Sequence, residues 1–455
     1  MTKIIKQTGR LLGVLILGLA SLALPWAQAH AAHDIRGITG PTFNLYAFVF
    51  NMNLPEGSSL QMWGFGDADD GAGATHPEGE GYGLPQYPGP TLIVTEGDTV
   101  TINLTNLGVP QPVSIVVTGH NLIANGGSTG LVTQAANVNE SVTYTFTAPA
   151  PGTYVYHSLD GANPGLHVEM GLLGALIVYP ADGSRSAYGA GTETDYEQEF
   201  LSLLTEVDPE IHIQMERGHV EHFTNSDRHA KVWFVNGRVF PDLFQGDFNT
   251  LFPNQPYQSL ALAHPGDKVL VRQVNAGQDS HPFHFHGENM RFVGRDGRML
   301  SSDGAVADLG RSDNTINSAP KQTVDAIWTW TGAKLGWDIY GTGPGYQHQC
   351  NGNNLNQGPS EGFDPDTGEY CPDHGKEFPV TLPGAQDLTL GGWWSGSPFL
   401  GDTGDLPPGE GGLNPFGGYF FVWHSHAEKE LTTFDIFPGG SLGAVVVLPS
   451  DVGIQ

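Results

Sequence analysis

The stretch Ser280-His281-Pro282-Phe283-His284-Phe285-His286-Gly287 places three histidines within six positions of an otherwise apolar run. Alternate side chains of a β-strand point to the same face, so His284 and His286 share a face and His281 lies near the start of the strand. Imidazole nitrogens at this spacing suit a transition metal, copper or zinc in particular. The stretch therefore predicts a metal-binding β-strand.

A second histidine pair, His424-Ser425-His426, repeats this spacing near the C-terminus. One such pair is compatible with a polar strand edge. Two pairs, each within an apolar and strongly β-like context, favour metal binding over surface or core histidines.

Three short motifs occur twice in the chain, in the same order. Residues 96–102, 152–158 and 171–178 are echoed by residues 265–271, 418–425 and 440–447. The chain also contains 63 glycines and 32 prolines, a composition typical of short strands joined by turns. The repeat predicts an all-β protein built from two copies of one β-sandwich.

The repeat divides the chain into parts with distinct compositions. We expect a signal peptide over residues 1–31, a first sandwich over 35–180, a linker over 181–230 and a second sandwich over 231–450. Within the linker, residues 199–207 have the composition of a strand, and Asp208-Pro209 is typical of a helix start. The second sandwich carries a long loop insertion over about residues 310–417.

The N-terminal signal indicates an exported protein, in which the two cysteines can be oxidised. A basic start precedes the apolar run 11–24, and Ala27-Gln28-Ala29 has the small residues of a cleavage site. A retained anchor is the alternative; no other apolar run is long enough to span a membrane. We expect a periplasmic or extracellular location and a disulfide between Cys350 and Cys371.

The chain is strongly acidic, with a formal net charge of -29. Nucleic acid is a poor partner for such a surface, because its phosphates would be repelled. The negative charge either attracts metal cations and cationic partners or only keeps an exported protein soluble.

These residues resemble the multicopper oxidase family over nearly the whole chain after the signal. Residues 281–287 are similar to its His-Pro-x-His-x-His-Gly motif, and Pro88-Gly89-Pro90-Thr91 is similar to its first-domain opening. The resemblance implies cupredoxin domains, which are Greek-key β-sandwiches. It also implies copper, and in active members the oxidation of a substrate coupled to dioxygen reduction at three clustered coppers, fed by a fourth, blue (type 1) copper.

The chain departs from the family at the blue-copper positions. Ser425 stands where the family has the thiolate ligand, Glu430 stands at the following histidine position, and only His281 of that ligand set remains. In the first copy, His157-Ser158 followed by His167 resembles the blue-copper ligands of copper nitrite reductases, again with serine for cysteine. A serine hydroxyl cannot replace the soft thiolate, so we predict that type 1 copper is absent.

The ligands of the copper cluster are better preserved. The resemblance gives six metal-binding positions: His120, His157, His284, His286, His424 and His426. By position, His284 serves the single type 2 copper and the others serve the coupled type 3 pair, with one to three ions in all. His281 and His167 are weaker metal candidates, and His167 is more typical of a buried residue than of a ligand.

The resemblance predicts an exported copper-dependent oxidoreductase without type 1 copper, which oxidises a metal ion or a phenol and reduces dioxygen. A non-catalytic copper storage or scaffold protein and a nitrite-reductase-like enzyme are the alternatives. Because two-domain relatives share each cluster between subunits, we expect a homotrimer in which His120 and His157 of one chain face the second sandwich of the next. A monomer that closes the site within one chain is the competing arrangement.

Overall fold

The computed structural model describes residues 35–68, 84–161, 163–219, 223–330, 350–352, 362, 371, 397–401, 418–448 and 453–454. The predicted signal peptide and most of the predicted insertion lie outside these residues. Within them, no helix combines the length and the apolar character that crossing a membrane requires. Cys350 and Cys371 form the predicted disulfide.

Domain 1 contains two five-stranded sheets that pack face to face. Its inner sheet has the order β1 (Ile38–Thr39), β4 (Leu92–Thr95), β12 (Leu173–Tyr179), β11 (Gly152–His157) and β6 (Val116–Val117). Its outer sheet has the order β3 (Ser59–Asp67), β2 (Thr42–Asn53), β5 (Thr99–Asn106), β10 (Ser141–Thr147) and β7 (Ile123–Gly126). A small hairpin of β8 (Ser128–Thr129) and β9 (Gln134–Ala135) completes this domain.

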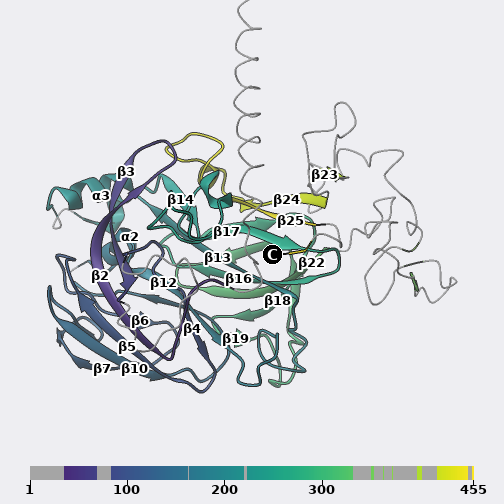
Figure 1. Cartoon of the computed structure of the whole chain (residues 1–455), viewed down its shortest axis with the longest axis horizontal. Coiled ribbons are helices and arrows are strands. Elements are labelled where there is room, and N and C mark those ends of the chain that lie inside the picture. Colours follow the sequence, from purple (N-terminus) through teal and green to yellow (C-terminus); the bar gives the residue numbers. More distant parts are fainter. Residues whose placement is uncertain are drawn as a thin grey trace, which may run out of the picture.

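Domain 2 repeats the sandwich with larger sheets. Its inner sheet has the order β14 (Val232–Val235), β13 (Gln198–Val207), β16 (Lys268–Asn275), β22 (Thr323–Thr329), β18 (Met290–Arg295) and β19 (Arg298–Met299), with β20 (Arg311–Asp313) on β18. Its outer sheet has the order β15 (Leu260–Ala263), β25 (Leu442–Val447), β24 (Gly418–Ser425), β17 (His281–Phe285) and β21 (Thr315–Ser318), with β23 (Ser397–Gly401) on β24. Figure 1 shows the two sandwiches side by side.

The sequence repeat corresponds to the same pairing in both domains. In domain 1, β12 pairs in parallel with β4 and antiparallel with β11. In domain 2, β25 pairs in parallel with β15 and antiparallel with β24. The predicted all-β, two-sandwich fold is therefore confirmed.

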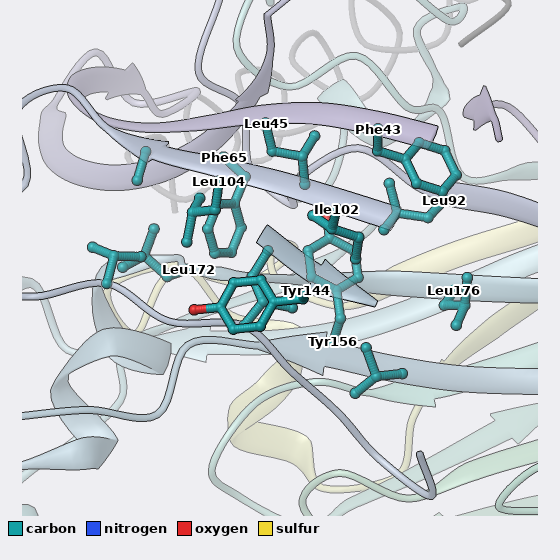
Figure 2. Packing of buried hydrophobic residues seen from close by; sticks show 14 of the residues in the cluster. Phe43, Leu45, Phe65, Leu92, Ile102, Leu104, Tyr144, Tyr156, Leu172 and Leu176 are labelled. Carbon is teal, nitrogen blue, oxygen red and sulfur yellow. The ribbon is translucent and has the colours of Figure 1, made fainter. Parts of the chain in front are cut away.

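Strict alternation of apolar side chains explains how the sandwich of domain 1 closes. Along β5 every second residue is buried, from Val100 to Leu104, while the intervening threonines and asparagine face outward. Figure 2 shows Ile102 and Leu104 meeting Tyr144 and Tyr156 in this core.

The two inner sheets pack on each other and form a third apolar layer between the domains. Val155 on β11 and Ile177 on β12 belong to the same buried cluster as Leu201 and Leu203 on β13. The neighbouring residue Phe200 faces the core of domain 2 instead. All ten residues of β13 are buried, because both faces of this strand are covered.

Two predicted boundaries need correction. The segment 181–230 is more than a linker, because β13 lies between β14 and β16 in the inner sheet of domain 2. The insertion also begins later than residue 310, since β20, β21 and β22 are strands of the sandwich. The strand over residues 199–207 and the helix start at Asp208 are both present, the latter as α3 (Pro209–Glu216), where Asp208 accepts the backbone N–H of Glu210.

Candidate metal centre

Four histidines lie together at the ends of two adjacent strands of the outer sheet of domain 2: His284 and His424 lie in the strands, and His286 and His426 directly follow them. The antiparallel pairing of β17 with β24 sets His284 directly opposite His424, which brings both side chains to one face. The ring centroid of His284 lies 4.8 Å from that of His286, 5.6 Å from His424 and 4.9 Å from His426. We call these four residues the histidine cluster.

Hydrogen bonds to the Nδ1 atoms determine which nitrogen is available to a metal. His424 Nδ1 lies 2.7 Å from the carbonyl oxygen of Ser425, which only accepts, so Nδ1 carries the proton. His284 Nδ1 lies 2.8 Å from Thr315 Oγ1, whose own proton goes to Asn314. In both residues Nε2 keeps its lone pair, the arrangement by which proteins orient metal-binding imidazoles.

The Nε2 atoms of His286 and His424 lie 3.1 Å apart. Since His424 Nε2 has a lone pair, His286 Nε2 donates the proton between them. Two imidazole nitrogens bound to one ion at about 2.0 Å each would be separated by about 3 Å. The pair thus has a spacing that one transition-metal ion accepts once His286 carries its proton on Nδ1 instead of Nε2.

Burial favours the neutral form of His284 and His424, the form that metal binding requires. Burial, followed by the neighbouring His424 and His426, lowers the pKa of His284 to about 4. Burial also lowers the pKa of His424. His284 is buried, His286 and His424 are half-buried and His426 is exposed, so the cluster opens to solvent on one side. Among the residues described, no three His, Cys, Asp or Glu side chains already converge as a metal-binding group.

The two candidates of domain 1 lie on other elements but share the same hydrogen-bond pattern. His120 follows β6, stacks edge-on against Phe146 and Tyr154, and donates Nδ1–H to the carbonyl of Thr118 at 3.1 Å. His157 ends β11 and donates Nδ1–H to the carbonyl of Ser158 at 3.1 Å. The Nε2 atom of His120 is buried and has no hydrogen-bond partner among the residues that the structure describes.

The alternation of β11 turns His157 towards domain 2. Thr153 and Val155, on the same face, contact Asp325 and the apolar layer between the domains. Burial and the nearby Lys321 lower the pKa of His157 to about 4. The structure therefore groups four of the six predicted ligands and places His120 and His157 apart from them in domain 1.

Charged side chains lie at the predicted blue-copper position of domain 2. His281 Nδ1 lies 2.8 Å from Glu430 Oε2, and His281 Nε2 lies 2.8 Å from Glu206 Oε2. Both nitrogens donate, so the ring is an imidazolium without a lone pair for copper. Burial acts against this charge, but the hydrogen bonds to the two carboxylates outweigh it and raise the pKa of His281 to about 10.

The corresponding position of domain 1 is a neutral hydrogen-bonded network. Ser158 Oγ accepts the backbone N–H of Ser114 and donates to His167 Nδ1 at 2.8 Å. His167 Nε2 then donates to Gln111 Oε1 at 3.0 Å. Burial and the neighbouring His157 lower the pKa of His167 to about 4. Both nitrogens of His167 are thus engaged in a fully buried site.

Sequence reasoning did not identify Glu206 or Arg228 as neighbours of His281 in domain 2. Arg228 binds Glu206 at 2.7 Å, Asp279 at 3.0 Å and Glu169 of α2 (Pro164–Met170). The available signal was Glu206 itself, an acidic residue shortly after the apolar pair Leu203-Leu204 near the end of β13.

Two multicopper oxidase family models match residues 85–183 and 212–334. A copper-containing nitrite reductase from Alcaligenes xylosoxydans xylosoxydans is 37% identical over 219 residues, which cover 47% of this chain and 62% of that protein. An L-ascorbate oxidase from Brassica rapa subsp. pekinensis is 32% identical over 126 residues, or 27% of this chain and 20% of that protein. The chain thus spans less than two thirds of the length of either relative.

The solved structures agree at the level of the fold. A blue copper oxidase from Nitrosomonas europaea superimposes with a TM-score of 0.52 at 17% identity, covering 89% of this chain and 85% of that one. With the motifs at residues 281–287 and 424–426, the two-sandwich fold and both family matches, the chain belongs to the multicopper oxidase family.

Proposed function

We propose that the chain is an exported copper-dependent oxidoreductase of multicopper-oxidase type that works without a type 1 copper. It couples the oxidation of a metal ion, such as Mn(II), Fe(II) or Cu(I), or of a phenol to the reduction of dioxygen. The observation that carries the proposal is the histidine cluster, where four imidazoles meet and two have Nδ1 fixed by hydrogen bonds.

The residues present fit copper in the type 2 and type 3 manner. Neutral imidazole nitrogens are suitable ligands for copper, and His284, His286, His424 and His426 supply four of them. Copper bound there supplies one-electron redox chemistry with dioxygen. Thr315 and the carbonyl of Ser425 hold the ring planes, while burial of His284 keeps a proton from competing for its Nε2.

Absence of type 1 copper is supported by the two serine positions. Ser425 and Ser158 have hydroxyl groups where a type 1 copper needs thiolates. In both His281 and His167, the two ring nitrogens form hydrogen bonds with other side chains. Electrons then reach the cluster directly from a bound donor or from a partner protein.

A homotrimer would complete the cluster with His120 and His157 of a neighbouring chain. The unpartnered Nε2 of His120 supports this, because a buried imidazole nitrogen without a partner is costly in a finished site. Large apolar side chains near it in the sequence are exposed: Ile123 by 75%, Leu131 by 56% and Val132 by 59%. Such residues favour a protein contact.

Copper content and oxygen uptake of the purified protein test the proposal together. The His284→Ala/His286→Ala variant should lose most bound copper and remain folded, whereas His264→Ala, in the turn before β16, should keep it. Oxygen uptake with Fe(II), Mn(II) or a phenol should depend on the same pair. Bound copper without turnover would favour a storage or scaffold protein, and turnover of nitrite with an electron donor would favour the nitrite-reductase-like alternative.

The subunit arrangement has a separate test. Light scattering should give the mass of three chains, and a monomer with full copper would contradict the shared site. Mixing His120→Ala and His286→Ala chains after dissociation should regenerate some complete interfaces and recover copper or activity. A site closed within one chain would recover neither.

A further inference from the structure

A buried series of charged groups connects the two domains beside the histidine cluster. Glu169 on α2 of domain 1 binds Arg228, and Arg228 binds Glu206 on β13 of domain 2. Glu206 accepts from His281, whose other nitrogen donates to Glu430 on the 3-10 helix η8 (Glu428–Leu431). The side chains of Glu206, His281 and Glu430 are each at most 3% exposed.

The carboxylate of Glu206 is fixed independently of His281. Its Oε1 atom accepts the backbone N–H groups of Gln278 at 2.7 Å and Asp279 at 2.9 Å. The preceding residue must be glycine, because a Cβ on Gly277 would lie 2.0 Å from Glu206 Oε2. The loop that leads into β17 is therefore built around this carboxylate.

His281 and Glu430 join the two segments that carry the histidine cluster. His281 begins β17, three residues before His284, and Glu430 lies four residues after His426. A backbone bond reinforces the link, since the N–H of His426 donates to the carbonyl of Pro282 at 2.7 Å. The side-chain bridge thus spans the point where the exposed His426 leaves the sheet.

We propose that Glu206, His281 and Glu430 form a positioning array that fixes the segment carrying His424 and His426 against the strand carrying His284 and His286. Through Arg228 the same array fixes this cluster relative to domain 1. The link to copper rests on the function proposed above; the positioning itself does not. The protonated His281, held by Glu206 and Glu430, thus links these segments in the way that a metal ion bound at this position would.

Two single substitutions test the array in the full-length protein. His281→Gln and Glu430→Gln each remove one charge but keep a hydrogen-bonding group, and His264→Gln is the matched control at a half-buried histidine paired with Asp267. We expect amide exchange over residues 425–431 to quicken. Copper affinity should fall by about tenfold or more, the magnitude typical of removing groups that orient metal ligands. The copper hyperfine signal should change in both variants and not in the control.

A paired apolar replacement separates positioning from stability. His281→Met/Glu430→Leu removes the His281–Glu430 pair, and such replacements of buried ion pairs are often neutral or stabilising. Glu206 loses one donor but keeps Arg228 and the backbone N–H groups of Gln278 and Asp279. We expect this variant to unfold near the wild-type midpoint while its copper signal stays altered. A wild-type copper signal in that variant would overturn the inference.

The amide-exchange measurement tests the positioning role of the array independently of copper binding. Unchanged protection of residues 425–431 in His281→Gln and Glu430→Gln would overturn the inference. If the wild-type protein bound no copper, the proposed function would fail, and faster exchange in the two variants would still support the positioning role.

Discussion

Thr153 Oγ1 on β11 of domain 1 donates a hydrogen bond of 2.6 Å to Asp325 Oδ1 on β22 of domain 2. Asp325 also accepts from Tyr188 at 2.6 Å and lies 3.7 Å from the guanidinium of Arg272. Arg272 is completely buried and forms its main ion pair with Glu199. The inner sheets are therefore joined by an ionic network as well as by apolar contact.

Thr153→Val should weaken the junction between the domains. The substitution leaves a buried carboxylate with one donor fewer, and hydrogen bonds to charged groups contribute about 1.5–3 kcal/mol. Urea unfolding monitored by fluorescence measures the loss. Thr143→Val, which removes a half-buried bond to Asn103 within domain 1, is the control and should cost less.

The free energy of unfolding should fall as the pH rises from about 6.5 to about 10. The pKa of His281 is raised to about 10 in the folded protein, above the unfolded value of about 6.5. The stability that His281 contributes is therefore complete below about pH 6.5 and is lost as the pH rises through about 10. The change should be on the order of a few kcal/mol. Urea titrations across this range measure it, and His281→Gln should flatten the alkaline limb.

Glu206 should produce the opposite slope in acid. Burial acts to raise its pKa, but His281, Arg228 and the backbone of Gln278 lower it to about 2. A depressed folded pKa contributes stability above the unfolded value of about 4.3, and this is lost as the pH falls towards 2. Glu206→Gln should remove that acid dependence; an unchanged acid limb would show that Glu206 is not the group responsible.

The copper-loaded protein should lack an intense thiolate-to-copper absorption band in the visible red. Ser425 and Ser158 stand where the family resemblance predicts the cysteine ligands, and Cys350 and Cys371 are joined in a disulfide. Absorption and electron spin resonance spectra of the copper-loaded protein provide the measurement. A strong blue colour with a narrow hyperfine splitting would be incompatible with this structure.

Trp423→Phe should affect both stability and the cluster. Trp423 is 1% exposed, packs against Phe285 and Trp328, and donates its indole N–H to the carbonyl of His286 at 3.2 Å. Losing that bond and part of the ring should cost about 1–3 kcal/mol and weaken copper binding. Phe421→Leu, two residues earlier in the same core, is the control and should affect stability alone.

The sequence was sufficient to predict features whose signals are local or repeated. The motifs at residues 152–158 and 418–425 repeat, and they became equivalent strands, β11 and β24. The spacing of His284 and His286 predicted a shared face, and their rings are in contact. Asp208 before Pro209 predicted the helix cap.

Features formed by distant residues were not predictable in this way. Glu206 and Glu430 lie 75 and 149 positions from His281, and no local sequence pattern predicts that they contact it. The role of β13 was missed for the same reason, since its pairing with β16 is parallel and crosses about 70 residues of chain.

The place of β13 in the inner sheet of domain 2 has a consequence for cutting the protein into fragments. A fragment starting at residue 231 would keep β14 and β16 but lose the strand between them. Two strand edges would then lie open in the middle of a sheet, a form prone to aggregation. A soluble second half must therefore begin before Gln198. The apolar residues on the face that domain 1 normally covers must also be replaced by polar ones.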